Sequence, residues 1–487
     1  MKLRNRKKYF VLFLFALLVK LLSASYLLYL TNHQSASNSS NPFSVLTAQY
    51  PIAEDTVDPM ENFVTKGTYY RWNGSEMVYA GRMPHYSLIY CFFRFFFSKQ
   101  LTCFSISLFQ IIIESVSIIF LCMLAELVFQ SKIAFYWVYM IQLISLNTSA
   151  SNLWIDPLSL SESFLVISIY FLYKYLEEEN IKILIISGIC FGYVVTLRPY
   201  IGMFYGVFFL QLLINYRHST GIKRLISVGK LSLIYFMPFL LLVTPWIIRN
   251  YSIYHRFIPM QINLTAGEYF PNSHFAYRKY ISALGESFQS WDKRSAGSYF
   301  EPRYKTGSEY VFPSYVFTKN YTMKEIEDVK NKFANVFETR NDSLDKLVEG
   351  KFIEMRDEFI SEHPIRFYLL SPVKRLKIFL FHSGSYYLPI NKEFPSYKPY
   401  QMLIKISQSL LYYFTLLFGF SGLVALAFLN KNNLLLLSIP VVLIVFFVLI
   451  LQDIGFQYFD HSYPFMCVGS FCSTLFILKK RQDKTQT

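Results

Sequence analysis

The stretch "CFSISLFQIIIESVSIIFLCMLAELV", residues 103–128, is almost entirely apolar and is long enough to cross a bilayer as one helix. A membrane-spanning helix needs about 20 predominantly apolar residues. Segments of this kind recur along most of the chain, so we predict an all-α polytopic membrane protein with about ten spans. The predicted spans are residues 9–30, 103–128, 132–149, 159–176, 182–198, 200–215, 225–248, 401–429, 434–451 and 462–478.

The composition supports this class. The 487 residues are 53% hydrophobic, 19% aromatic and only 16% charged, which is more apolar surface than a soluble core could bury. The net charge of +15 comes from basic clusters that flank apolar segments, as the positive-inside rule predicts, so we expect no nucleic-acid partner. The six cysteines all lie in apolar runs, which indicates neither a disulfide framework nor a metal site.

The basic N-terminus, "MKLRNRKK", sets the expected topology. The apolar segment behind it is longer than a typical signal-peptide core and lacks a small-x-small cleavage site, so we predict an uncleaved anchor. With that terminus in the cytoplasm, three stretches face outward: residues 31–102, the connection "NTSASNLWIDPLSLSE" (147–162) and the polar region from about 250 to 400.

We therefore divide the chain into three parts. Residues 1–250 form an N-terminal transmembrane bundle that includes the first outer loop, residues 251–400 form an extracytoplasmic domain, and residues 401–487 form C-terminal transmembrane helices. The middle part carries apolar residues at helical spacing in "TMKEIEDVKNKFANVF" (322–337) and "SLDKLVEGKFIEMRDEFI" (343–360), which predicts a small, mostly α domain. The short segment "YSLIYCFFRFFF" (86–97) is predicted to lie along the interface.

Carboxylates are concentrated in the first outer loop, where "PIAEDTVDPMENF" (51–63) carries Glu54, Asp55, Asp58 and Glu61. A carboxylate just outside the hydrocarbon, with an arginine nearby, suits a reaction on a lipid-linked phosphate. The carboxylate acts as a base on an acceptor while the cation holds the leaving phosphate. The alternative is a solvated acidic turn that caps a helix starting near Pro59.

The second outer connection places Asp156 and Glu162 at the start of a predicted span. Acidic residues in or near the membrane are costly and are functional candidates by default. The alternative is that Ser159 or Ser161 caps the helix, with Glu162 in its first turn, where the helix dipole favours a negative charge.

Two arginines stand at outer ends of predicted spans, Arg198 in "TLRPY" and Arg249 in "TPWIIRNY". Arginine is disfavoured on the outer face, so each calls for an anionic partner. That partner is either an internal carboxylate or lipid headgroup, or a substrate phosphate bound in bidentate fashion.

The order of these features resembles the GT-C superfamily of polyprenyl-phosphate-dependent glycosyltransferases. The branch in question contains protein O-mannosyltransferases and the aminoarabinose transferase that modifies lipid A. The stretches that carry the resemblance span most of the chain. They are "ENFVTKGTYYRWNG", "RMPHYSLIY", "IDPLSLSESF", "GYVVTLRPY", "TPWIIRNYSIYHRFIP", "HPIRFYLLSPVKRLKIFLFHS" and "QYFDHSYPF". The most specific of them is "TPWIIRNY…FIP".

The resemblance implies roles for single residues. It makes Asp55 the catalytic base, with Glu54 and Asp58 as rivals, and it makes Arg82 in "GRMPHY" the contact to the donor phosphate. The second-loop acid that assists the base corresponds to Asp156 or Glu162.

The resemblance is incomplete ahead of the last span. Relatives often carry Arg-Tyr there, whereas this chain has Gln457-Tyr458, followed by Asp460 and His461. Tyr458 and His461 are nevertheless candidates for substrate binding, together with Arg82, Arg198 and Arg249.

The implied reaction is inverting transfer of a sugar from polyprenyl phosphate to a hydroxyl, on the extracytoplasmic side of the cell's inner (plasma) membrane. It requires no metal and no cofactor, and the acceptor can be a protein, a lipid or a glycan. Membrane lipid surrounds the spans. The alternatives are a flippase or exporter of lipid-linked oligosaccharide and an O-antigen polymerase or ligase.

Overall fold

The computed structural model describes residues 3–34, 51–72, 76–216, 221–261, 270–288, 295–300, 308–382, 388, 398–452 and 455–485. Regular structure in these ranges is helical except for one antiparallel hairpin, β1 (Arg71–Trp72) with β2 (Met77–Val78). The chain forms two compact units. The first comprises residues 1–267, 383–440 and 460–487, and the second comprises residues 268–382 and 441–459.

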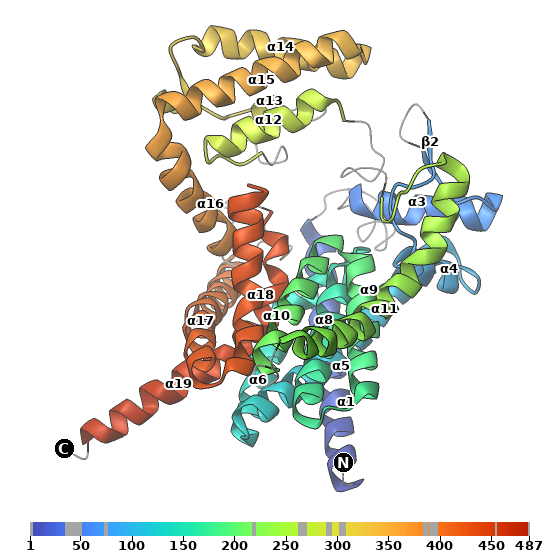
Figure 1. Cartoon of the computed structure of the whole chain (residues 1–487), viewed down its shortest axis with the longest axis vertical. Helices are drawn as coiled ribbons and strands as arrows, with labels where there is room; N and C mark the ends of the chain where they lie inside the picture. The colour runs from blue at the N-terminus through green and yellow to red at the C-terminus, as the bar shows by residue number, and fades with distance from the viewer. Residues whose placement is uncertain are drawn as a thin grey trace. The chain divides into compact units, whose positions relative to one another are not determined.

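The first unit is a helical bundle (Figure 1). Its helices, which include the start of α18, are α1 (Leu3–Gln34), α3 (Pro51–Lys66), α4 (Ser87–Arg94), α5 (Lys99–Phe129), α6 (Lys132–Ile144), α7 (Leu146–Ser151), α8 (Leu158–Glu178), α9 (Ile181–Leu197), α10 (Phe204–Asn215), α11 (Gly221–Tyr254), α17 (Pro399–Leu429), α18 (Leu434–Ile444) and α19 (Tyr463–Thr485). Short 3-10 turns, η1 (Pro199–Met203), η6 (Lys431–Asn433) and η9 (Asp460–Ser462), connect some of them.

Every predicted span is wholly or mostly helical, which confirms an all-α polytopic membrane protein. Five helices are long and apolar enough to cross a bilayer: Lys7–Leu30, Lys99–Phe129, Gly221–Tyr254, Pro399–Leu429 and Lys431–Ile450. Three shorter apolar helices accompany them: Lys132–Ile144, Ile181–Leu197 and Pro199–Asn215.

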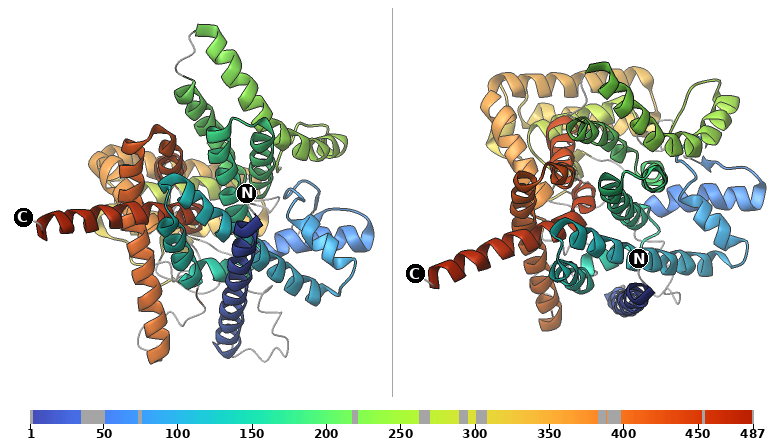
Figure 2. Two further views of the ribbon diagram at one scale, coloured as in Figure 1. Left: turned by 90° about the horizontal axis from the view of Figure 1, so that it is seen from below. Right: turned by 60° about the horizontal axis from the view of Figure 1, so that its bottom comes forward.

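Glycines set the closest helix packing in this unit. On α9, a Cβ built at Gly188 would lie 2.6 Å from the Tyr235 carbonyl oxygen of α11, and one at Gly192 would lie 2.8 Å from the Phe239 nitrogen. Helices α17 and α19 cross each other (Figure 2), and Gly422 faces the backbone of Gly469 at this contact. Small residues let membrane helices approach closely and gain dispersion energy, which substitutes for the hydrophobic effect that lipid removes.

The second unit contains a smaller helical group. Its elements are α12 (Asn272–Ala283), α13 (Ala296–Phe300), η2 (Ser314–Val316), α14 (Met323–Thr339), α15 (Asp342–Glu362), η3 (Arg366–Leu370), α16 (Ser371–Leu380), η7 (Val445–Ile450) and η8 (Phe456–Tyr458). Its core is aromatic, with Tyr277, Phe300, Phe333 and Phe352 all 1% exposed or less. These rings lie in tilted and edge contacts, which aromatic quadrupoles favour.

The two amphipathic helices predicted in this region are confirmed as α14 and α15. Hydrogen bonds within the first turn mark the start of each helix. Thr322 and Glu325 form a capping box at α14, and Asn341 Oδ1 accepts the backbone amides of Ser343 and Leu344 at α15.

Candidate active site

Asp156 and Arg198 form a buried ion pair in the first unit. Asp156 lies in the turn before α8 and Arg198 directly follows α9, and they are 5% and 8% exposed. Asp156 Oδ1 also accepts the backbone amide of Leu158 at 2.6 Å. The sequence left several anionic partners open for Arg198. The structure shows one of them, an internal carboxylate, which is Asp156.

The start of α8 differs from the capping alternative. Asp156 accepts the first amide of the helix, whereas Ser159 donates to Asn152 Oδ1 and Ser161 donates to the Leu158 carbonyl at 2.7 Å. The expectation that Ser159 or Ser161 caps α8 is therefore wrong, because nearby polar groups take up both hydroxyls.

A hydrogen-bonded bridge links the predicted first outer loop (31–102) to the predicted second outer connection (147–162). Tyr86 donates its hydroxyl to Gln110 Oε1 at 2.8 Å. The amide nitrogen of Gln110, on α5, donates to the carbonyls of Asn152 and Trp154 at 2.8 and 2.9 Å. Because Tyr86, Gln110 and Asn152 are all buried, each of these bonds satisfies groups that would otherwise be costly. The two loops are therefore held together by one glutamine.

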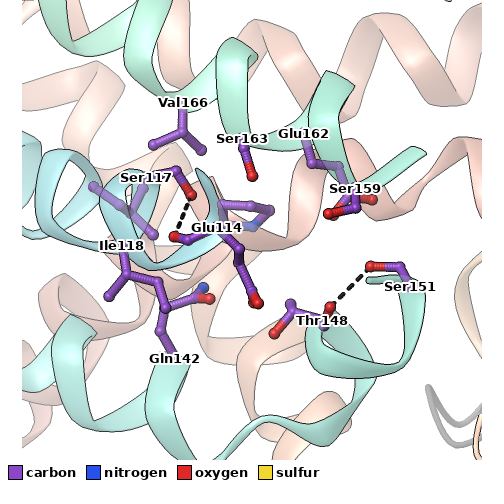
Figure 3. Close-up of a pocket in the computed structure, with 12 residues that line it drawn as sticks. Glu114, Ser117, Ile118, Gln142, Thr148, Ser151, Ser159, Glu162, Ser163 and Val166 are labelled. Atoms are coloured by element: carbon purple, nitrogen blue, oxygen red, sulfur yellow. Dashed lines mark hydrogen bonds between the residues drawn. The ribbon is translucent and has the colours of Figure 1, made fainter. Parts of the chain in front are cut away.

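A second polar network shares Asn152 with this bridge. Lys20 of α1 is fully buried, and its Nζ lies 3.0 Å from Glu114 Oε1 of α5. Lys20 also donates to Thr148 Oγ1 at 2.8 Å and to Ser149 Oγ at 3.1 Å. Asn152 donates to the other oxygen of Glu114. Figure 3 shows Glu114 and Thr148 lining the same small pocket.

Nothing local in the sequence relates Lys20 to Glu114, so the pattern of residues does not predict this network. Lys20 does not snorkel, because its ammonium group is enclosed by α5 and α7. The available signal was that the predicted spans 9–30 and 103–128 hold opposite charges, Lys20 and Glu114, near their middles, and charges inside the membrane pair with one another.

The acidic stretch of the first outer loop lies on α3, which begins at Pro51 and continues through Pro59. The expected helix start near Pro59 is therefore wrong. Asp58 is exposed, whereas the side chains of Glu54 and Asp55 lie outside the described residues. The fold thus supplies a helical frame for all three candidate bases.

Glu61, one turn after Asp58 on α3, forms an ion pair with Arg94. Its two oxygens accept Arg94 Nε at 3.1 Å and Nη2 at 3.2 Å, and Oε2 also accepts the Tyr90 hydroxyl at 2.7 Å. Burial acts to raise the pKa of Glu61, but hydrogen bonds from Arg94 and Tyr90 outweigh it and lower the pKa below its usual value. Glu61 therefore fastens α3 to α4.

Arg249 links the first outer loop to α11 through hydrogen bonds to backbone carbonyls. Its guanidinium donates to the carbonyls of Tyr79 and Tyr69 at 2.8 and 2.7 Å, and it lies 4.8 Å from the centre of the Trp246 ring. A planar guanidinium can bond two carbonyls and stack on an aromatic ring at the same time, which the ammonium group of lysine does poorly. Arg82, also in this loop, is half-buried, and its carbonyl accepts the Tyr69 hydroxyl at 3.1 Å.

The segment before the last helix divides between the units. Tyr458 belongs to the second unit and stacks on Phe447 with ring centres 4.2 Å apart. His461 belongs to the first unit and is fully buried between Ser161 and Tyr200.

The hydrogen bonds of His461 determine its tautomer. Ser161 gives its one hydroxyl proton to the Leu158 carbonyl, so it accepts from His461 Nε2 at 2.8 Å. Nδ1 then accepts from the Tyr200 hydroxyl at 3.3 Å. Burial, with Arg198 nearby, lowers the pKa of His461 to about 3, so the ring is neutral at physiological pH.

Comparison with known proteins gives one sequence-family match. No curated protein sequence is significantly similar to the chain. Among solved structures, the apo oligosaccharyltransferase of Archaeoglobus fulgidus aligns with a TM-score of 0.47 and 12% identity over 97% of this chain. The chain covers 52% of that protein, about half of its length.

Residues 84–242 match the family model of dolichyl-phosphate-mannose-protein mannosyltransferases. The matched segment contains the Tyr86–Gln110 bridge and the Asp156–Arg198 pair. Residues 84–242 are therefore similar to a family of GT-C glycosyltransferases, in agreement with the resemblance that the sequence motifs carry.

Proposed function

We propose that the chain transfers a sugar, with inversion, from a polyprenyl-phosphate donor to a hydroxyl acceptor at the extracytoplasmic face of the inner (plasma) membrane. The family match over residues 84–242 supports the donor class, because its description names a polyprenyl-phosphate sugar. The observation that carries the proposal is the Tyr86–Gln110 bridge, which joins the loop of candidate bases to the turn that holds Asp156.

The base in this scheme is a carboxylate of α3, with Asp55 preferred and Glu54 and Asp58 as alternatives. Asp156 acts through its pairing with Arg198, because its Oδ1 is already bound by a guanidinium and by the backbone amide of Leu158. We therefore assign Asp156 to positioning the second connection beneath the first loop.

The cation for the leaving phosphate is Arg82, the position to which the resemblance gives this role. Arg198 pairs with Asp156, and Arg249 donates to the carbonyls of Tyr69 and Tyr79, so both of these also hold the fold. In the reaction, the base removes the acceptor hydroxyl proton while the oxygen attacks the anomeric carbon. The bond from that carbon to the phosphate oxygen breaks, and Arg82 stabilises the negative charge of the released polyprenyl phosphate.

The test uses the full chain in lipid nanodiscs with a panel of polyprenyl-phosphate monosaccharides, beginning with mannose. Release of free polyprenyl phosphate and the mass of the acceptor product are measured for Glu54→Gln, Asp55→Asn and Asp58→Asn. We expect one variant to lose at least a hundredfold in rate, which is the usual contribution of a general base, on the order of 10²–10⁴. Asp357→Asn, an exposed carboxylate of α15, is the matched control.

Full activity in all three variants would exclude the base assignment. Movement of intact donor across the membrane of proteoliposomes, without cleavage, would instead indicate the flippase that the sequence left open.

A further inference from the structure

Two small cavities lie beside Glu162 inside the first unit, and each has a volume of about 20 Å³. Such a volume holds one particle the size of a water molecule. Thr148, Ser151 and Glu162 line both cavities, and Figure 3 shows these side chains at the first of them. The second cavity is lined by Asn147, Thr148, Ser151, Glu162, Tyr412, Asp460 and Tyr463.

Every side chain that lines the second cavity carries an oxygen atom. Two are carboxylates, one is an amide, and the others are hydroxyls of serine, threonine and tyrosine. Hard cations such as Na⁺ and Ca²⁺ are held by oxygen ligands of these kinds. The chemistry of the lining therefore suits a metal cation better than an apolar ligand or an anion.

Glu162 supplies a second and independent observation. It is only 9% exposed, and its Oε1 has no hydrogen-bond partner among the described residues. Both polar atoms of the Asn147 side chain and the Tyr463 hydroxyl are likewise buried without such a partner. A buried carboxylate oxygen that lacks a partner is costly, more so inside a membrane protein.

The neighbouring cations are already engaged by other carboxylates. Lys20 pairs with Glu114, and Arg198 pairs with Asp156. Neutralisation of Glu162 by either one would break an existing buried pair, which is strongly unfavourable.

We propose that Glu162 and Asp460 bind one hard cation in this cavity, with Asn147, Thr148 and Ser151 as neutral oxygen ligands. The ion joins α7 and α8 to η9, which precedes α19, and so stabilises the bundle. Within the described residues no three His, Cys, Asp or Glu side chains come together, which favours an alkali or alkaline-earth ion over a transition metal. Mg²⁺ fits poorly, because it retains waters for which a cavity of this size has no room.

The proposal does not depend on sugar transfer, so its test reads stability and ion content. The full chain is purified in detergent, treated with chelator and exchanged into choline chloride. Thermal unfolding is followed by tryptophan fluorescence in NaCl, KCl, CaCl₂ or MgCl₂ at constant ionic strength. We expect Na⁺ or Ca²⁺ to raise Tm in a saturable manner, because an ion that binds only the folded state stabilises it by mass action. The two salts distinguish a monovalent from a divalent ion.

Glu162→Gln and Asp460→Asn should each abolish the ion-specific rise in Tm. Glu178→Gln, on the same helix but exposed and paired with Lys174, should retain it. Bound ²²Na⁺ or calcium, measured after gel filtration, should approach one ion per chain and fall in Asp460→Asn. If Glu162→Gln does not fold, Ser151→Ala, which removes a neutral ligand, should reduce the same ion-specific rise in Tm. The same Tm in all four salts, or an unchanged shift in both carboxylate variants, would overturn the proposal.

Discussion

Asp156 and Arg198 are ion-paired with 8% and 9% of their side chains exposed, and they join the turn before α8 to the end of α9. Both residues are close to Tyr86, whose hydrogen bond to Gln110 links the first outer loop to α5. The pair is therefore a fixed structural connection beneath the proposed active site, and its loss has consequences for folding as well as for transfer.

Breaking this pair should destabilise the protein strongly. Removal of one partner leaves a buried charge uncompensated, which typically costs about 3–5 kcal/mol. We expect Asp156→Ala and Arg198→Ala to lower the free energy of unfolding by that order, and the double variant to lose less than the sum. Denaturant unfolding in detergent, followed by tryptophan fluorescence, measures all three.

The exposed pair Lys174–Glu178 is the matched control, since its side chains are 34% and 49% exposed. Surface pairs contribute about 0–1 kcal/mol, so Lys174→Ala and Glu178→Ala should have small effects. Additive losses at Asp156 and Arg198 would show that the two charges are not coupled.

The hydrogen bonds of Arg249 give a prediction about the first outer loop. Arg249→Lys keeps the charge but removes the planar fork that bonds the carbonyls of Tyr69 and Tyr79. We expect this variant to expose the loop between Tyr69 and Tyr79 to proteolysis and to reduce transfer about tenfold or more, because misplaced catalytic groups are costly. Limited proteolysis with mass spectrometry locates the new cleavage sites.

Arg256→Lys serves as the control, because Arg256 is exposed just beyond the end of α11. If both lysine variants gave the same cleavage pattern and rate as the unmodified chain, Arg249 would have no role in holding the loop.

The sequence predicted the helices well because their lengths follow from the thickness of the membrane and from local capping residues. The predicted apolar spans 103–128 and 401–429 correspond to α5 and α17, and the Thr322–Glu325 capping box marks the start of α14. These signals are local, so they can be read without knowledge of the fold.

The partners of buried polar groups were harder to predict, because they depend on which helices pack together. Lys20 and Glu114 are 94 positions apart in sequence, and nothing local relates them. The internal carboxylate was one of several partners open to Arg198, and only the packing of α8 against α9 selects Asp156. The choice of Asp55 among the candidate bases rests on the resemblance alone, since the fold supplies a helix for each of them.

The burial of His461 predicts how stability depends on pH. Its pKa of about 3 in the folded protein lies below the ordinary value of 6.5, so folding favours the neutral ring. The contribution of this residue to stability is therefore fully present above pH 6.5 and is lost progressively as the pH falls toward 3. We expect Tm to decline across this window, and to decline less steeply in His461→Gln.

Tm measured at half-unit intervals between pH 4 and pH 8 tests this expectation in the unmodified chain and in the variant. His255→Gln is the control, because His255 is exposed. A slope between pH 6.5 and pH 4 that is the same with and without His461 would contradict the assignment.

The crossing of α17 and α19 predicts opposite effects for two glycine substitutions. A Cβ at Gly422 would overlap the Gly469 carbonyl, a backbone group that cannot rotate away, whereas nothing lies within 4 Å of a Cβ at Gly229 on α11. Gly422→Ala should therefore destabilise the bundle by about 1–3 kcal/mol through overpacking. Gly229→Ala should stabilise it by up to about 1 kcal/mol, because alanine favours a helix more than glycine does. Unfolding in detergent compares the two variants, and a gain in stability at Gly422→Ala would show that the two helices do not pack through their glycines.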